Sequence, residues 1–238
     1  MFEKLDVKPT DLTKPLAFDT GDQKIVYWSA QGQSKMEAIG EFIPQYFGDS
    51  AIYVVGRRGS GKSTYCSDYI NSYYEQTCNR VFYVSRFTTD PSVSLPPRSL
   101  MLDIQQLQDV TLEDLRKSLI VFDDIHSAQL TPKESTYLQK FILDVIENSR
   151  HLDCSCIITS HMATNYSKTR PILNECSAVV FFPEYSNPQQ VQHMLKYYQA
   201  MTPAQVEHLF SLGKDSRWVQ LQTINPKFIL TQKHIETY

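Results

Sequence analysis

Ala51-Ile-Tyr-Val-Val-Gly-Arg-Arg-Gly-Ser-Gly-Lys-Ser-Thr64 is the stretch that decides the fold, because an apolar run leads directly into Gly56-x-x-x-x-Gly61-Lys62-Ser63. This spacing is that of a P-loop, in which glycines let the backbone curl until its N–H groups face a phosphate. In that pattern Lys62 reaches the outer phosphates and the Ser63 hydroxyl can hold Mg²⁺. The residues expected to contact a nucleotide are Gly56, Arg57, Arg58, Gly59, Ser60, Gly61, Lys62, Ser63 and Thr64.

The residues that flank this motif give it the context that a P-loop requires. Residues 51–55 predict a short buried strand, and helical spacing after the loop predicts a helix whose N-terminus attracts anions. The apolar and aromatic residues at this spacing are Tyr65, Cys66, Tyr69, Ile70, Tyr73 and Tyr74. The alternative is a chance match in a surface loop, and a strand on one side with a helix on the other argues against it.

Composition is typical of an intracellular globular protein. The 238 residues are 42% apolar, enough for one substantial core, and no apolar run is long enough to cross a bilayer. The first residues lack a secretion signal, so we expect an intracellular protein without membrane insertion. A net charge of −3 argues against a protein that coats nucleic acid with its whole surface, but it is compatible with a local basic channel. The five cysteines show no zinc-like spacing and are expected to be reduced structural thiols.

A second motif, Ser118-Leu-Ile-Val-Phe-Asp-Asp124, places apolar residues directly before two carboxylates. Buried parallel strands have this pattern, and their C-terminal ends lie where open α/β sheets bind ligands. Asp123 is in the position to hold Mg²⁺ through water, and Asp124 is in the position to polarise an attacking water. The alternative is a strand followed by an ordinary acidic turn, and the P-loop upstream favours the catalytic interpretation.

Strands and helices are expected to alternate along the rest of the chain. Apolar runs predict strands at 24–28, 80–85, 155–160 and 177–182, and helical spacing predicts helices at 36–47 (interrupted by Pro44), 131–148, 191–198 and 204–212. The second of these helices begins with Thr131 as N-cap, Pro132 at the first position and Glu134 closing a capping box, and the fourth is preceded by Thr202-Pro203 as cap and first residue. Such alternation gives an α/β fold with a mostly parallel sheet covered on both faces.

The sequence divides into three parts. Residues 1–22 are polar and show no sustained period, which is typical of an N-terminal arm. Residues 23–200 form the P-loop core. Residues 201–238 add a C-terminal helix and a small β-hairpin appendage, with strands expected at 217–222 and 227–231.

The remaining motifs separate the classes of P-loop protein. The chain has no Asn/Thr-Lys-x-Asp motif of GTPases and no Leu-Ser-Gly-Gly-Gln signature of transporter ATPases. A second acid directly follows Asp123, and the strand at 155–160 ends in a polar group. This order resembles the motor branch of P-loop ATPases, which have a three-layer RecA/ASCE-like fold.

Within that branch, several stretches together resemble the poxvirus-type genome-packaging ATPases of the FtsK–HerA superfamily, which occur in large DNA viruses and virophages. They are Gly-Arg-Arg-Gly-Ser-Gly-Lys-Ser-Thr at 56–64, Ile-Val-Phe-Asp-Asp-Ile at 120–125, Asn-Ser-Arg-His at 148–151 with Ile-Ile-Thr-Ser-His at 157–161, and Thr-Arg-x-x-Leu-Asn-Glu at 169–175 with Val-Val-Phe-Phe-Pro at 179–183. The resemblance covers roughly residues 50 to 185, and the last two stretches are its more specific part.

The resemblance implies a homo-oligomeric ring of five or six subunits that hydrolyses ATP with Mg²⁺ and drives double-stranded DNA into a preformed capsid. It therefore implies capsid or portal vertex proteins as partners, and action in the host cytoplasm, at the site of virus assembly, or on the virion. Residue by residue, Lys62 and Ser63 would bind phosphates and Mg²⁺, Asp123 the metal, and Asp124 would be the base, although the family's base is often Glu. His161 matches the polar sensor at a strand end, and Arg150 matches the arginine that reaches into the next subunit's site.

Other interpretations of these residues remain open. Arg150 is a basic residue at a helix C-terminus, where it is favourable in any protein, and His161 could be an ordinary hydrogen-bonded histidine. The other functions to weigh are a small-molecule phosphotransferase, such as a nucleoside kinase, and a nucleotide-gated assembly factor that binds ATP without turnover.

Candidate DNA contacts are two pairs of cations, and such residues are more often ordinary surface charges. They are Lys168 with Arg170, and Arg116 with Lys117. A translocating ring needs only a few cations per subunit, because symmetry multiplies them and backbone phosphates carry no sequence information.

Overall fold

The computed structural model describes the backbone of residues 16–19, 25–28, 35–37, 42–44, 46, 50–86, 93–124, 130–224 and 227–238. Within the predicted N-terminal arm, 1–22, only β1 (Leu16–Asp19) is described, and the rest of the arm lies outside the described residues. β1 pairs antiparallel with β2 (Ile25–Trp28), which confirms the strand predicted at 24–28.

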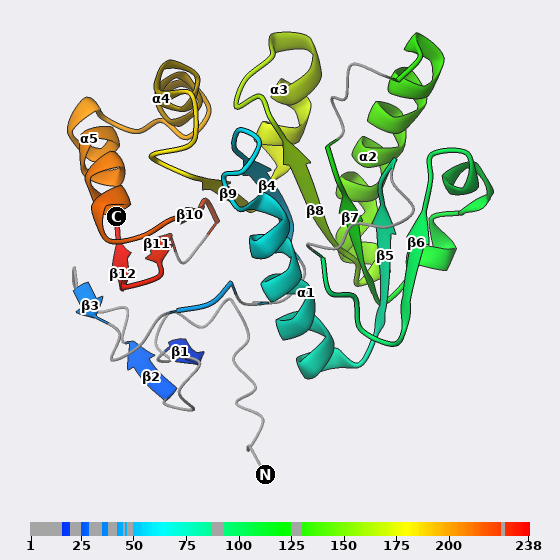
Figure 1. Ribbon diagram of the computed structural model, residues 1–238, viewed down its shortest axis with the longest axis horizontal. Coiled ribbons are helices and arrows are strands. Elements are labelled where there is room, and N and C mark those ends of the chain that lie inside the picture. The colour runs from blue at the N-terminus through cyan, green and yellow to red at the C-terminus, as the bar shows by residue number, and fades with distance from the viewer. Residues whose placement is uncertain are drawn as a thin grey trace.

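A ten-stranded sheet forms the centre of the molecule (Figure 1). Its strands are β3 (Lys35–Glu37), β4 (Ala51–Val55), β5 (Arg80–Val84), β6 (Ser99–Leu102), β7 (Ser118–Phe122), β8 (Ser155–Ser160), β9 (Ala178–Phe181), β10 (Val219–Gln222), β11 (Phe228–Thr231) and β12 (His234–Thr237). Their spatial order is β3-β12-β11-β10-β9-β4-β8-β7-β5-β6. The α-helices are α1 (Lys62–Thr77), α2 (Pro132–Leu152), α3 (Tyr166–Glu175), α4 (Pro188–Tyr197) and α5 (Pro203–Ser211). Short 3₁₀ helices occur at η1 (Gln106–Asp109), η2 (Glu113–Leu115) and η3 (Leu212–Lys214).

Helices cover both faces of this sheet, which confirms the predicted three-layer α/β fold. Side chains alternate along a strand, so neighbouring residues of β4 enter different cores. Ile52 and Val54 join the core that contains the apolar side of α1, whereas Tyr53 and Val55 join the core that contains α2 to α5. The P-loop strand is therefore buried on both faces, as its unbroken apolar run predicts.

The parallel part of the sheet brings the motif ends together. β9, β4, β8, β7, β5 and β6 are all parallel, and β8 lies between β4 and β7. The residues that follow β4, β7 and β8 consequently emerge at one edge, which we call the carboxyl edge; the opposite side is the amino edge. Open α/β sheets bind their ligands at the carboxyl edge.

The predicted C-terminal hairpin is confirmed and is continuous with the central sheet. β10 and β11 pair antiparallel, with Val219 opposite Thr231, and β10 also pairs with β9. β12 and β3 follow on the far side. Val219 belongs to one hydrophobic core and Leu230 to the other. The hairpin therefore contributes side chains to the cores on both faces of the sheet, as the parallel strands do.

The helix predicted across 36–47 is wrong. Lys35–Glu37 form β3, residues 42–44 are not helical, and 38–41, 45 and 47–49 lie outside the described residues. β3 pairs with β12, where Met36 lies opposite Ile235. Without β3, this side of β12 would present unpaired backbone groups, and such long-range pairing overrides a weak helical period.

The helix predicted from 131 is confirmed as α2, and its capping box is present in full. Thr131 Oγ1 accepts a hydrogen bond from the Glu134 N–H, and the Glu134 carboxylate accepts one from the Thr131 N–H. Helices α4 and α5 confirm the other two helical patterns. Sequence analysis missed α3, whose interior contains Pro171, a residue that normally interrupts a helix.

No disulfide links the five cysteines, all of which lie in the described part of the chain. Cys66, Cys154, Cys156 and Cys176 are buried, and burial raises the pKa of the Cys66 and Cys156 thiols. A thiol that stays protonated is a weak nucleophile, so these side chains act as small core residues. Among the described helices, none combines the length and the apolar character that a membrane span requires.

Tyr65→Phe is expected to destabilise the protein by about 1–3 kcal/mol, because it leaves a buried acceptor without its donor. The buried Tyr65 hydroxyl donates to Gln220 Oε1 over 2.7 Å and so links α1 to β10. Urea unfolding measures the effect. Tyr74→Phe is the matched control, since Tyr74 is a half-buried tyrosine of the same helix; equal midpoints for the two variants would contradict the prediction.

Candidate functional site

The loop between β4 and α1 folds into a tight, closed turn at the carboxyl edge. The Gly56 N–H donates to Ser160 O and the Ser60 N–H donates to Arg57 O, each over 3.1 Å. Gly59 and Gly61 have φ angles of 78° and 111°, which side-chain-bearing residues rarely adopt. A Cβ on Gly56 would lie 2.4 Å from Ser60 Oγ, so the turn leaves no room for one. The glycines of the motif are therefore required by the loop that forms.

The backbone N–H groups in the first turn of α1 carry partial positive charge that no side chain of the turn neutralises. Gly61 is the N-cap and has no side chain to accept the first N–H groups, and no acidic residue lies in the first turn. These N–H groups have no partners within the helix, so they and the helix dipole favour an anion. Ser63 is half-buried in this turn and Thr64 is exposed, whereas Arg57 and Arg58 of the loop are exposed and Ser60 is buried.

The buried Lys62 ammonium bonds to the backbone of the loop itself. Its Nζ donates to Gly56 O over 2.8 Å and to Arg57 O over 3.3 Å. Burial lowers the pKa of Lys62, and the nearby carboxylates of Asp124 and Asp123 oppose that shift. The lysine is thus held at the loop and is stabilised in its charged form by the acidic pair. A phosphate at this loop would replace the two carbonyls as the acceptor of the Lys62 hydrogen bonds.

Thr159 of β8 positions the two acidic residues that follow β7. Its Oγ1 donates to Asp123 Oδ1 over 2.7 Å and accepts from the Asp124 N–H over 2.8 Å. Asp124 has a φ angle of 49°, a left-handed conformation that costs an L-residue energy unless its surroundings hold it. One hydroxyl therefore fixes the side chain of the first acid and the backbone of the second.

His161 connects the lysine to the acidic pair. Its Nδ1 lies 3.2 Å from both Lys62 Nζ and Gly56 O, and its Nε2 lies 3.4 Å from Asp124 Oδ2. With the proton on Nε2, the ring accepts from the ammonium on one side and faces the carboxylate with a donor on the other. The structure thus brings together four residues predicted from separate motifs, Lys62, Asp123, Asp124 and His161.

The donor atoms at this edge suit Mg²⁺. Carboxylate and hydroxyl oxygens are the ligands that this hard cation prefers, and Asp123 and Ser63 supply one of each. Ser63 is half-buried in the first turn of α1, and the half-buried Asp123 follows β7 at the same carboxyl edge.

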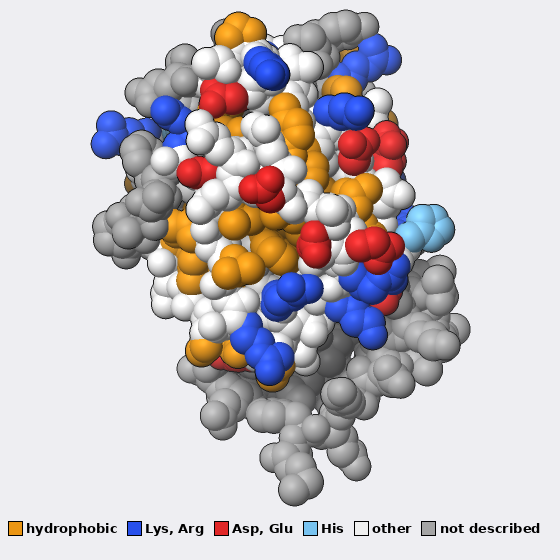
Figure 2. Space-filling model, turned by 90° about the vertical axis from the view of Figure 1, so that its right-hand side faces the viewer, with side chains coloured by type: hydrophobic (Ala, Val, Ile, Leu, Met, Phe, Trp, Pro, Cys, Tyr) orange, Lys and Arg blue, Asp and Glu red, His pale blue; other side chains and the backbone are white. Residues whose placement is uncertain are grey.

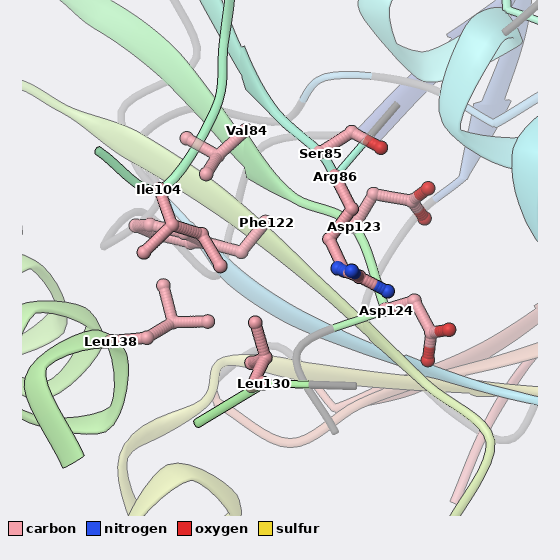
Figure 3. A pocket seen from close by; sticks show the side chains of 9 residues that line it. All are labelled: Val84, Ser85, Arg86, Ile104, Phe122, Asp123, Asp124, Leu130 and Leu138. Atoms are coloured by element: carbon pink, nitrogen blue, oxygen red, sulfur yellow. The ribbon is translucent and has the colours of Figure 1, made fainter. Parts of the chain in front are cut away.

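A small apolar pocket lies directly behind the acidic pair (Figure 3). Its volume is about 10 Å³, room for roughly one water molecule. Apolar side chains form one wall of the pocket: Val84, Ile104, Phe122, Leu130 and Leu138. Figure 3 shows the Arg86 guanidinium on the same side as the Asp123 and Asp124 carboxylates, away from this wall. Arg86 follows β5, and sequence analysis did not identify it.

Arg150 lies far from the site of its own chain. It occupies the last turn of α2, a helix of 21 residues that begins near the carboxyl edge and is about 30 Å long. No described residue forms a hydrogen bond or ion pair with its exposed guanidinium. Its position at the amino edge rules out contact with the P-loop of the same subunit, and the contact with a neighbouring subunit stays a prediction.

The candidate DNA contacts Arg116 and Lys117 line a basic groove at the amino edge. The groove has a volume of about 560 Å³ and is lined by Asn79, Arg80, Pro97, Arg98, Ser99, Leu100, Arg116 and Lys117. One of its cations is paired: Arg116 Nε donates to Glu113 Oε2 over 3.0 Å. Figure 2, which faces the side of the molecule that is on the right in Figure 1, shows Lys and Arg side chains in both its upper and lower halves, with Asp and Glu side chains among them. The other candidates, Lys168 and Arg170, lie apart from the groove on α3, which follows the carboxyl end of β8.

Two residues that contact the motifs were not assigned a role from sequence. Thr159 ends a buried strand, and its polar side chain in an apolar run is a signal that could have identified it. Arg217 precedes β10 and bonds to the P-loop backbone across 157 positions of sequence. No local pattern marks Arg217, because its contact depends on how the C-terminal strands join the sheet.

Comparison with known proteins identifies a relative in a virophage. No protein-family model matches the chain. It is 33% identical over 191 residues to protein V3 of Sputnik virophage, which covers 78% of this chain and 76% of that protein.

Solved structures with the same fold are P-loop NTPases. The genome-packaging NTPase B204 of Sulfolobus turreted icosahedral virus 2, in complex with ATP-gammaS, has a TM-score of 0.54 and 13% identity, with 79% of this chain and 98% of that chain covered. The pCW3 conjugation coupling protein TcpA, in its monomer form with ATPgS, has a TM-score of 0.54 and 11% identity, with 88% and 72% covered. These similarities confirm the predicted fold class.

Thr159→Val is expected to reduce the kcat of ATP hydrolysis about 10–100-fold, the usual effect of losing a residue that orients a metal ligand. Valine keeps the shape of threonine but cannot bond to Asp123 and Asp124. Steady-state hydrolysis over a range of Mg²⁺ concentrations measures the loss. Thr159→Ser, which retains the hydroxyl, is the matched control and should stay close to wild type; an unchanged kcat and Mg²⁺ dependence in Thr159→Val would refute the assignment.

Proposed function

The chain belongs to the family of protein V3 of Sputnik virophage, and from this we propose that it is an ATP-hydrolysing motor that translocates double-stranded DNA into a viral capsid. The observation that carries the proposal is the continuous contact from Lys62 through His161 to Asp124. It joins a phosphate-binding loop to an acid placed for hydrolysis. The fold shared with a genome-packaging NTPase supports the same function.

We propose that Lys62 exchanges its loop carbonyls for the outer phosphates of ATP. Carbonyl oxygens carry only partial charge, whereas a phosphate oxygen is an anion and forms a stronger, charge-assisted bond with an ammonium. The first-turn N–H groups of α1 and the backbone of Gly56 to Gly61 would hold the remaining phosphate oxygens. Mg²⁺, when bound by Ser63 and Asp123, supplies charge that stabilises the transferring phosphoryl group.

Asp124 is the proposed base that orients the attacking water. Its carboxylate lies beside His161 and its backbone N–H donates to Thr159, so two contacts with β8 and the residue that follows it fix its position. His161 is the proposed sensor. When a phosphate draws Lys62 away from Nδ1, only Gly56 O, 3.2 Å away, remains beside that nitrogen, so the ring would turn its Nδ1 proton toward this carbonyl and its contact with Asp124 would change. Phosphate occupancy would thereby be linked to the base.

A ring of five or six subunits is the proposed assembly. In this arrangement Arg150 of one subunit reaches the phosphates that the next subunit holds. Arginine supplied from a neighbour stabilises the transition-state charge and is worth about 10³–10⁵ in rate. The partners of such a ring are the capsid or portal vertex proteins, at the site of virus assembly in the host cytoplasm or on the virion.

The basic groove at the amino edge is the proposed contact with the DNA backbone. It brings Arg116 and Lys117 together with Arg80 and Arg98, from three separate segments of the chain. All three guanidinium groups are oriented by backbone carbonyls: Arg98 Nη1 donates to Cys78 O over 3.2 Å, Arg80 Nη2 to Asp114 O over 3.0 Å and Arg116 Nη1 to His151 O over 3.2 Å. Arg116 is also paired with Glu113, so a DNA phosphate would compete with that carboxylate. Such contacts are electrostatic and independent of base sequence.

ATPase rate per subunit is expected to rise with protein concentration and to rise further with double-stranded DNA, because the ring completes each site. Lys62→Ala is the matched control and should be inactive under all conditions. Activity that is stimulated by a nucleoside, with no dependence on protein concentration or DNA, would reject the motor in favour of a nucleoside kinase. Binding of ATP without turnover in the wild type would favour an assembly factor.

Arg150→Ala is expected to bind ATP normally and to lose turnover in the ring by about 10³-fold or more. Mixing Arg150→Ala with Asp124→Asn subunits should restore part of the activity, because some interfaces then combine an intact arginine with an intact acid. The rate is measured over a range of mixing ratios. Lys140→Ala, which removes an exposed cation from the same helix, should retain full activity; no rescue at any ratio would count against a role between subunits.

A further inference from the structure

Arg217 holds the P-loop from its outer side. Its Nε donates to Ser60 O over 2.8 Å, and its Nη2 donates to Gly59 O over 3.0 Å. Both acceptors are backbone carbonyls of the glycine-rich turn. The two bonds come from one planar guanidinium, so they fix the orientation of two successive peptide groups at once.

The position of Arg217 is set by the C-terminal strands. Its backbone N–H donates to Gln232 Oε1 over 2.7 Å, and the next residue, Trp218, packs edge-on against Tyr65 of α1 with ring centroids 5.4 Å apart. Trp218 is buried, whereas Arg217 is exposed and lies against the loop. The strand that continues the central sheet therefore carries the arginine to the P-loop.

The two hydrogen bonds from Arg217 also fix the direction of the N–H groups that follow each carbonyl. In a trans peptide the C=O and the following N–H point in opposite directions. Because Arg217 Nε holds Ser60 O on the outer side, the N–H of Gly61 is directed inward, where the motif receives phosphate. The second bond, to Gly59 O, orients the Ser60 N–H, which closes the turn by donating to Arg57 O.

Tyr185 completes the support of the loop. The Arg217 guanidinium lies over the Tyr185 ring, 5.1 Å from its centroid, and Tyr185 O accepts the N–H of Arg57 over 3.1 Å. A Cβ on Gly61 would lie 3.0 Å from Arg217 Nε, so the arginine packs closely over the last glycine of the motif. Tyr185 and Arg217 thus hold opposite ends of the same turn.

We infer that Arg217 is a positioning residue of the nucleotide site, which keeps the P-loop N–H groups directed at the α- and β-phosphates. The inference rests on the proposed ATP binding and extends it to the C-terminal strands. It assigns Arg217 no contact with the nucleotide itself. ADP and ATP share the two phosphates that the loop backbone receives, so loss of Arg217 should weaken both equally.

The test is calorimetric titration of ADP and of ATPγS into wild type and Arg217→Ala, without DNA. Both dissociation constants are expected to rise about tenfold, with no change in circular dichroism, because Arg217 is exposed and outside both cores. Arg217→Lys should be intermediate, since a lysine can bond to one carbonyl at a time. Lys227→Ala is the matched control: it removes an exposed cation of the same C-terminal strands, 5.9 Å from the centroid of the Tyr238 ring, and should bind as wild type.

Two results would overturn the inference. Unchanged dissociation constants in Arg217→Ala would show that the loop keeps its shape without the arginine. Weaker ATPγS binding with unchanged ADP binding would show that Arg217 contacts the third phosphate. If Arg217→Ala were unfolded, Arg217→Lys and Tyr185→Leu would provide the same comparison. Failure of wild type to bind either nucleotide would reject the proposed function, whereas binding that is insensitive to Arg217 would reject only this inference.

Discussion

The parallel register of β4, β8 and β7 is the constraint on which the site depends. Val55 pairs with Ser160, and Phe122 pairs with Ile158, so the three strands end within a few residues of each other. Because β8 lies in the middle, its last residues can reach the P-loop on one side and the acidic pair on the other. Thr159 and His161 make those two connections.

The site is a cluster of charges that is only partly exposed to water, and this makes its members sensitive to one another. Burial disfavours the charged form of Lys62, while Asp124 and Asp123 favour it, so the lysine and the acids stabilise each other. His161 lies between them and can accept or donate at either nitrogen. In the mechanism that we propose, a phosphate that enters this cluster changes the balance of charge at Lys62, and the change extends to Asp124 through His161.

The C-terminal strands are part of the same structural unit as the P-loop. Tyr65 bonds to Gln220, Trp218 packs against Tyr65, and Arg217 bonds to the loop carbonyls, so α1 and its preceding turn are held from β10. The C-terminal strands that were predicted as an appendage therefore extend the central sheet. Nucleotide binding and the packing of residues 217–238 are expected to affect each other.

Sequence alone determined the P-loop, the acidic pair and most of the sheet, because these depend on local spacing, strand-length apolar runs and capping residues such as Thr131 and Glu134. It also indicated that His161 lies at the same edge. Only the tertiary structure decided that Thr159 holds both acids, that Arg217 holds the loop, and that Lys35–Glu37 form a strand. Each of these depends on contacts between segments far apart in the chain. The spacing of apolar residues within one segment does not show which distant segment it will pack against.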